Sequence, residues 1–201
     1  MNATSRLILV RHGTCARLDE LLLGRAIDAP LDEHGVIQAK AVADYLAQVK
    51  RPVLECSPRR RARETAEYIG ERLGLIPRLA PALDEIDFGE WAGRSFAELE
   101  GDAHWQAWNA NRSDTSTPAG ENIAAVRTRV TAHLDELRRE HPHASLILVT
   151  HAEIIRTLVM SWLGFSPDQY GQVPIGTASV TTVAFESVGA QVQELNMQVA
   201  A

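Results

Sequence analysis

The sequence has little cysteine, little lysine and no long apolar run, and each shortage excludes a class of protein. Cys15 and Cys56 are the only cysteines in 201 residues, too few for a disulfide framework and without the spacing of a metal site. They fit a reducing compartment, and we expect the cytoplasm. No apolar stretch approaches the roughly 20 residues that span a membrane. The apolar run before Arg11 is only four residues long (7–10), too short for the core of a signal peptide.

A surplus of positive charge is also missing. The formal net charge is −6, whereas a general nucleic-acid-binding domain is usually basic. The basic residues are nearly all arginine, and the run Arg59-Arg60-Arg61-Ala62-Arg63 resembles a nucleic-acid patch only in its charge. Because this run has no interleaved aromatic residues, we interpret it as a solvent-exposed helix face in which one arginine is functional. The sequence therefore predicts neither a nucleic-acid nor a membrane partner.

Length and pattern together predict one α/β domain over residues 1–201. The chain is 45% hydrophobic and 23% charged, an ordinary globular composition. Short apolar runs alternate with helical patterns, which favours a three-layer α/β/α fold with a mostly parallel central sheet. The expected strands are 7–10, 53–56, 146–149 and two closing strands near 178–185 and 191–197. The first expected helix begins at Asp32 and ends at Pro52, and the second extends from Ser57-Pro58, as N-cap and first helical residue, to Gly74. A third is expected from about Glu121 to Glu140, and a fourth follows residue 151.

One segment breaks this regular alternation. Residues 84–118 contain three glycines, three tryptophans and the polar stretch Asn-Arg-Ser-Asp-Thr-Ser-Thr. We expect a small cap or lid insertion at about 86–118, within the same domain.

The most informative feature is a repeated string. Leu-Ile-Leu-Val occurs at 7–10 and at 146–149, and each copy is followed, two residues on, by a histidine, His12 or His151. Open parallel sheets bind ligands outside the carboxyl ends of their strands, so neighbouring copies would bring both imidazoles to one edge. A lone histidine at a strand end is commonly only a hydrogen-bonded residue. Two histidines that each follow the same apolar string favour a functional site.

Other groups are expected at the same edge. Arg11 precedes the first histidine, and Arg61 lies in the first turn of the helix that follows Ser57-Pro58. Two guanidinium groups, two imidazoles and a helix N-terminus would bind a dianion such as phosphate. Cleavage of a phosphate ester also needs an acid, and a carboxyl with a raised pKa can supply the proton. The candidates crowd one segment, and their spacing does not choose among them: Asp84, Glu85, Asp87 and Glu90.

Several blocks of residues, taken in order along the chain, resemble the histidine phosphatase superfamily, the phosphoglycerate-mutase-like group with the Arg-His-Gly signature. The resemblance extends from Leu7 to about Phe185 and is closest to the small bacterial phosphatases that include α-ribazole phosphatase. The matching residues are Arg11-His12-Gly13, Gly24-Arg25 with Asp28, Ser57-Pro58-x-x-Arg61-Ala62-x-x-Thr65-Ala66, Glu85 with Phe88-Gly89-x-Trp91-x-Gly93, Pro118-x-Gly120-Glu121, and Val149-Thr150-His151.

The resemblance implies a role for each site residue. His12 is the expected nucleophile, which becomes phosphohistidine, and Glu85 is the expected proton donor. Arg11, Arg61 and a protonated His151 are expected to hold the phosphoryl oxygens. Because these fixed cations neutralise the transferred group, we expect no metal and no cofactor. Candidate substrate contacts are Thr14, Arg25 and Ala152, together with the tryptophans Trp91, Trp105 and Trp108.

Hydrolysis of a small-molecule phosphate ester is the function that this pattern favours. A phosphoglycerate-type mutase is the main alternative. The mutases of this family carry a longer insert, whereas the stretch from Glu85 to Pro118 is short here. A shorter lid admits water to the site, which favours hydrolysis. A non-catalytic phosphate-ester binding module is a further alternative, because Ala152-Glu153 stands where many members have glycine after the second histidine. A protein phosphatase would need a surface groove that the sequence cannot show. The identity of the leaving group stays open, as does a homodimer through the edge strand near 178–197.

Overall fold

The computed structural model describes residues 5–186 and 189–200, and it confirms the predicted three-layer α/β/α fold. Its strands are β1 (Ser5–Arg11), β2 (Pro52–Cys56), β3 (Arg78–Leu79), β4 (Ser145–Thr150), β5 (Val180–Glu186) and β6 (Gly189–Met197). They form one sheet in the order β3-β2-β4-β1-β5-β6. The pairs β3–β2, β2–β4 and β4–β1 are parallel, whereas β5 and β6 close the sheet antiparallel.

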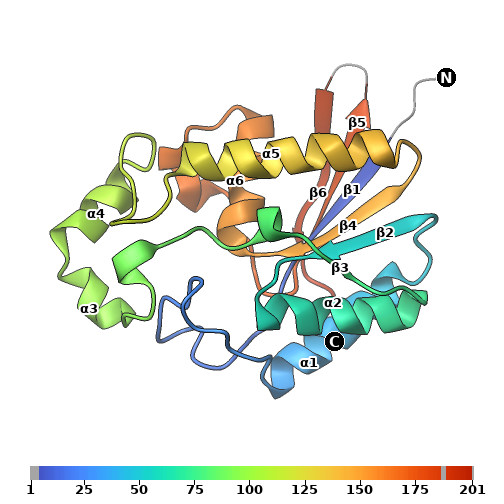
Figure 1. The fold of residues 1–201 in the computed structure, drawn as a ribbon, viewed down its shortest axis with the longest axis horizontal. Helices are drawn as coiled ribbons and strands as arrows, with labels where there is room; N and C mark the ends of the chain where they lie inside the picture. The colour runs from blue at the N-terminus through green and yellow to red at the C-terminus, as the bar shows by residue number, and fades with distance from the viewer. Residues whose placement is uncertain (1–4, 187–188, 201) are drawn as a thin grey trace.

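Helices cover both faces of this sheet (Figure 1). The α-helices are α1 (Glu33–Leu46), α2 (Arg60–Leu73), α3 (Phe96–Glu100), α4 (Ala103–Ala110), α5 (Ile123–Glu140) and α6 (Ala152–Leu163), and the 3-10 helices are η1 (Pro81–Leu83), η2 (Gly89–Trp91) and η3 (Pro167–Gln172). In Figure 1, α5 and α6 lie on one side of the sheet, and α1 and α2 lie on the other. No helix in the described ranges combines the length and the apolar character that a membrane span needs.

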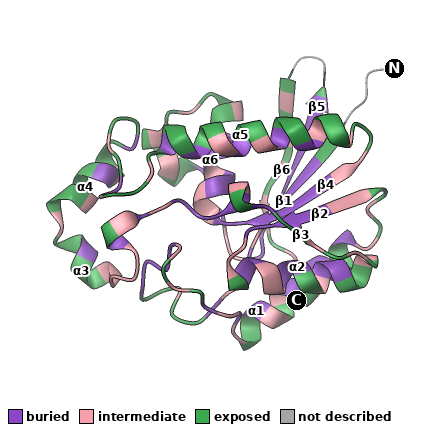
Figure 2. Cartoon of the chain, in the orientation of Figure 1, coloured by how far each residue is buried: buried purple, intermediate pink, exposed green. Residues whose placement is uncertain are grey.

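Alternating side chains of the repeated Leu-Ile-Leu-Val string build the core on both faces. Leu7 and Leu9 of β1 belong to the apolar cluster that includes the buried residues of α5 and α6. Ile8 and Val10 belong to the cluster formed with α1 and α2. Because successive strand residues point to opposite faces, a strand covered on both sides must be apolar at every position. Figure 2 shows these central strands as the most continuously buried part of the chain.

Two predicted boundaries were wrong, and one strand was not predicted. The first helix ends at Leu46 instead of Pro52, because residues 47–51 form the turn that leads the chain into β2. The second helix is capped by Arg59, since the Ser57 hydroxyl accepts the Arg59 backbone N–H before the helix begins. The two-residue strand β3 was not predicted, because its exposed residues Arg78 and Leu79 carry no apolar run.

The segment expected to form a cap, residues 86–118, contains η2, α3 and α4 (Figure 1). We call it the cap segment below. Its apolar centre is aromatic, with Trp91 and Trp108 almost fully buried and Trp105 stacked on Trp108. These residues belong to the same apolar cluster as α5 and α6, so the cap segment extends the core of that face.

Candidate active site

The parallel pairing of β1 and β4 brings His12 and His151 together. Arg11 is in register with Thr150, so each histidine is the first residue beyond its strand at the same edge of the sheet. The backbone N–H of His12 donates to the Thr150 carbonyl, and the two imidazole centroids lie 5.2 Å apart. Both side chains are buried. Two residues separated by most of the chain thus form one site.

The hydrogen bonds of His12 fix its tautomer. Nδ1 lies 2.7 Å from the carbonyl oxygen of Gly13, which can only accept, so Nδ1 carries the proton. The Arg61 Nε–H donates to Nε2 at 3.2 Å, which therefore presents a lone pair. Burial, followed by the charges of Arg61 and Arg11, lowers the pKa of His12 well below its usual range. The imidazole is neutral, as a nucleophile must be.

Arg61 is held at the centre of the site by backbone carbonyls. It lies in the first turn of α2, is 2% exposed, and donates from Nη2 to Gly24 and from Nη1 to Ile27. Arg11 is fixed in a similar way, with Nη1 donating to the Ile175 carbonyl at 2.7 Å. Burial lowers the pKa of both guanidinium groups, but arginine keeps its charge in proteins. Two oriented cations therefore flank His12.

The contacts of His151 fit a neutral ring, whereas the protonated form was expected around a transferred phosphoryl group. Its Nδ1 lies 3.3 Å from Nη2 of Arg61, which can only donate, so Nδ1 carries the lone pair. Its Nε2–H donates to Ser57 Oγ at 2.7 Å. Burial and then the charge of Arg61 lower the pKa of His151 well below its usual range. A neutral ring follows because a third buried cation beside two arginines would be repelled.

Among the four candidate acids, only Glu85 lines the cavity in front of His12. It is 8% exposed; its Oε1 accepts the Ile86 backbone N–H, and its Oε2 lies 3.8 Å from His151 Nδ1. Burial, followed by the negative charge of Glu153, raises the pKa of Glu85 to about 7. Glu85 can therefore both give and take a proton near neutral pH.

Thr14 and Arg25, two of the expected substrate contacts, do not line this cavity. The Thr14 hydroxyl donates to the N-cap carboxylate Asp32 at 2.7 Å. Arg25 donates to the Glu85 carbonyl at 2.7 Å and to Glu121 at 2.8 Å. Glu121 also accepts the Asp87 backbone N–H, so Arg25 and Glu121 fix the loop that carries the acid. Ala152 does line the cavity.

The whole cavity has a volume of about 490 Å³ and reaches from His12 to the cap segment. Trp105 and Trp108 line it, whereas Trp91 is buried behind them in the apolar cluster. Its walls also include residues that no motif in the sequence indicated: Asn109, Arg112, Arg156 and Tyr170. These residues become neighbours only when the cap segment folds against α6 and η3, and their sequence context is that of ordinary helix and loop positions. No cluster of three metal-ligating side chains occurs in the part of the chain that the structure describes.

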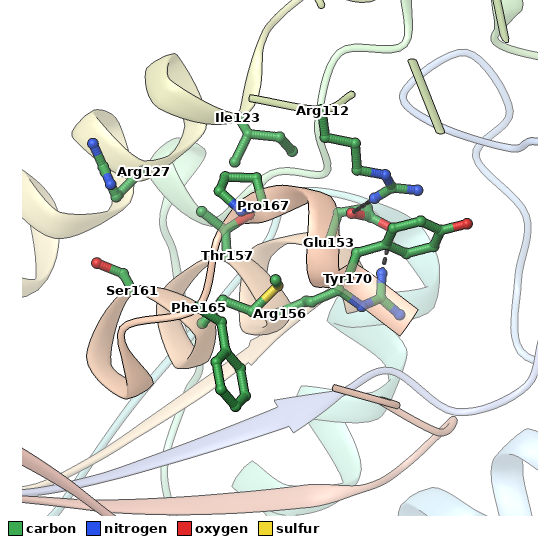
Figure 3. Close-up of a pocket in the computed structure, with 11 residues that line it drawn as sticks. Arg112, Ile123, Arg127, Glu153, Arg156, Thr157, Ser161, Phe165, Pro167 and Tyr170 are labelled. Atoms are coloured by element: carbon green, nitrogen blue, oxygen red, sulfur yellow. Dashed lines mark hydrogen bonds and ion pairs between the residues drawn. The ribbon is translucent and has the colours of Figure 1, made fainter. Parts of the chain in front are cut away.

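Glu153 is the other unforeseen element of the cavity wall. The sequence indicated this residue only as a negative charge near the second histidine. In the structure, its carboxylate accepts hydrogen bonds from Arg112 Nη1 at 2.7 Å and from Arg156 Nη1. Figure 3 shows the Arg112 guanidinium beside the Tyr170 ring and the Glu153 carboxylate. The charge of Glu153 is therefore compensated inside the fold.

Comparisons with known proteins identify the family to which the chain belongs. The chain is 28% identical over 197 residues to phosphoserine phosphatase 1 of Hydrogenobacter thermophilus, covering 96% of this chain and 92% of that protein. It is 29% identical over 162 residues to the adenosylcobalamin/α-ribazole phosphatase of Escherichia coli, covering 79% of each. A mycobacterial glucosyl-3-phosphoglycerate phosphatase, solved with VO3, superposes with a TM-score of 0.83 at 29% identity, over 95% of this chain and 98% of that one. Residues 7–198 match the family model, and the chain belongs to the histidine phosphatase superfamily, branch 1.

Proposed function

We propose that this protein is a phosphomonoesterase that hydrolyses a small-molecule phosphate ester through a phosphohistidine on His12. One observation carries the proposal: Nε2 of a buried, neutral His12 carries a lone pair beside Arg61 and His151, in a cavity that Glu85 also lines. Family membership supports the same conclusion, since relatives of this chain are phosphatases of small phosphate esters.

In the first step, His12 Nε2 attacks phosphorus and the bond from phosphorus to the ester oxygen breaks. Glu85 in its acid form gives a proton to the departing alcohol. Arg11 and Arg61 stabilise the charge on the equatorial oxygens during in-line transfer. In the second step, Glu85 as carboxylate takes a proton from water, whose oxygen attacks phosphorus. The bond from phosphorus to Nε2 then breaks, releasing inorganic phosphate and restoring neutral His12.

His151 has a second role once a phosphoryl group is bound. Its Nδ1 faces the site, and Nε2–H stays engaged with Ser57. A dianion in the site favours a proton on Nδ1, because the imidazolium then donates to a phosphoryl oxygen. The protonated His151 expected from the family pattern therefore belongs to the occupied site.

The partner we propose is a small phosphate ester, not a nucleic acid or a membrane, given the net charge of −6. A cytoplasmic location is supported by two free, buried cysteines. A homodimer is supported only by β6, an edge strand whose side chains alternate between exposed and half-buried.

A hydrolysis screen over phosphate esters in EDTA tests the proposal. We expect turnover by the wild type despite the chelator, and a loss of roughly 10³-fold or more for His12→Ala. His34→Ala is the matched control, because it removes an exposed imidazole from α1. Quenched samples should contain an acid-labile, base-stable phosphoenzyme. Ester binding without that species would indicate a binding module, and isomerisation of phosphoglycerate without phosphate release would indicate a mutase.

A further inference from the structure

The cavity has a second cationic wall that the proposed chemistry does not use. Arg112 of the cap segment and Arg156 of α6 both line it, and both bind the carboxylate of Glu153. The same three residues and Tyr170 line a smaller cavity between α5, α6 and η3 (Figure 3). They therefore form a partition between the two cavities, and one side of that partition faces the position of the leaving group.

This wall carries one net positive charge. Burial alone would raise the pKa of Glu153, but Arg156 and Arg112 lower it overall, so the carboxylate stays ionised. Two guanidinium groups then face a single carboxylate. The other anionic side chains of the cavity do not offset the excess, because Glu85 serves the phosphate end and Asp19 is exposed to solvent.

Arg112 is held in a fixed orientation, with Nη1 donating to Glu153 and Nη2 to Asn109, and Arg156 beside it keeps a donor available. Arg112 is 4% exposed and held between the rings of Trp108 at 3.8 Å and Tyr170 at 3.6 Å, so its planar group is preorganised. Its Nε is buried without a hydrogen-bond partner among the described residues. Within the same described ranges, Arg156 uses Nε and Nη1 but not Nη2. Glu153 shows that this pair of guanidinium groups is spaced to bind a carboxylate.

We propose that the alcohol portion of the substrate carries a carboxylate, which Arg112 and Arg156 bind beside Glu153. The inference rests on the phosphatase function proposed above and names its substrate class. A neutral or cationic leaving group would leave the positive charge of this wall unpaired. A second phosphate would bring more negative charge than the one net positive charge of the wall. The remaining wall is apolar, formed by leucines and aromatic rings, which suits a short carbon skeleton.

Matched ester pairs test this preference. O-Phosphoserine and O-phosphoethanolamine differ only in a carboxylate, and 3-phosphoglycerate differs from glycerol 3-phosphate by a carboxylate in place of a hydroxymethyl group. We expect the carboxylated member of each pair to have a kcat/KM about tenfold higher or more, the effect of a charge-assisted hydrogen bond. p-Nitrophenyl phosphate reports phosphatase activity independently of this preference.

Variants assign the preference to the wall. Arg156→Gln should reduce the carboxylate preference about tenfold, and Glu153→Gln should increase it by removing the competing carboxylate. Arg127→Gln is the matched control, because this exposed arginine lines only the smaller cavity and its loss changes the net charge equally. We expect Arg127→Gln to keep the wild-type preference.

Two results would overturn the inference while leaving the proposed function intact. One is equal turnover of both members of each pair, with p-nitrophenyl phosphate hydrolysed. The other is an equal loss of preference in Arg127→Gln and Arg156→Gln. If no ester were hydrolysed, p-nitrophenyl phosphate included, the proposed function would fall and this inference with it.

Discussion

His12 and Glu85 show how burial, as the largest cause, can prepare a nucleophile and an acid. Burial disfavours the charged form of any group, so it lowers the pKa of His12 and raises that of Glu85 to about 7. Each residue is thereby kept in the neutral form that the first chemical step needs. The nearby arginines reinforce the effect on His12 and oppose it on Glu85, which leaves Glu85 able to ionise for the second step.

The raised pKa of Glu85 has a cost in stability that depends on pH. The folded protein binds this proton up to about pH 7, whereas an unfolded chain releases it near pH 4.3, so stability falls as pH rises between these values. Glu85→Gln should therefore stabilise the protein by roughly 3 kcal/mol at pH 8 and have little effect at pH 4. Denaturant unfolding at the two pH values measures this. An equal effect at both would contradict it.

Ser57 is the residue on which the orientation of His151 depends. Ser57→Ala removes the acceptor of the Nε2–H and leaves a buried donor unpaired, which costs about 1–3 kcal/mol. We expect inhibition by inorganic phosphate to weaken about tenfold and the ¹⁵N shifts of His151 to indicate a change of tautomer. Ser179→Ala is a close control, because Ser179 is buried and its Oγ has no hydrogen-bond partner among the described residues. Similar inhibition in both variants would argue against this role.

At the scale of elements, the loop from Asp84 to Gly93 places the acid. Gly89 has φ 54°, and a Cβ there would overlap the carbonyl oxygen of Pro118. Arg25, Glu121 and Arg129 hold the same loop from outside through the Glu85 carbonyl and the Asp87 N–H. The loop is thus fixed by backbone contacts on both sides, and the position of Glu85 depends on them.

Gly89→Ala should displace this loop. The left-handed backbone alone costs about 1–2 kcal/mol for alanine, and the overlap with Pro118 adds to it. We expect both a lower unfolding free energy and a loss of kcat, since Glu85 moves with the loop. Gly171→Ala is the control, because a Cβ there meets nothing within 4 Å. Unfolding curves and turnover of p-nitrophenyl phosphate measure the two effects, and a fully active Gly89→Ala would contradict the assignment.

At the scale of the whole molecule, one ion-pair cluster joins the cap segment to the sheet and its helices. Arg112 lies in the cap segment, while Glu153 and Tyr170 lie on α6 and η3. Breaking one partner of a buried pair costs about 3–5 kcal/mol, because the other charge is left uncompensated. Arg156 still faces Glu153, so the expected loss for Arg112 is at the lower end of this range.

Arg112→Met keeps the side-chain volume and removes the charge. We expect it to lower the unfolding free energy by about 3 kcal/mol and to speed hydrogen exchange in α4. Arg94→Met is the comparison, since Arg94 pairs with Asp102 inside the cap segment, where it is more exposed, and its loss should cost less than about 1 kcal/mol. Similar losses in the two variants would show that the cluster does not anchor the cap segment.

The sequence by itself determined most of the sheet and the meeting of His12 and His151 at one of its edges. The two Leu-Ile-Leu-Val strings could only be strands covered on both faces, and the ends of paired parallel strands must meet at one edge. The choice of Glu85 among four acids came from family resemblance, because spacing alone does not say which carboxyl faces inward. Boundaries set by turns, such as the end of α1 at Leu46, were not readable from an apolar pattern.

Only the tertiary structure decided the charge states and the far wall of the cavity. The neutral form of His151 follows from the two buried arginines and the Ser57 hydroxyl around it. Thr14 and Arg25 are held in other hydrogen-bond networks, through Asp32 and Glu121. The grouping of Arg112, Glu153 and Arg156 depends on how the cap segment packs against α6. Short-range patterns record which faces of an element are apolar, whereas a pKa or a pocket depends on groups that only folding brings within a few ångströms.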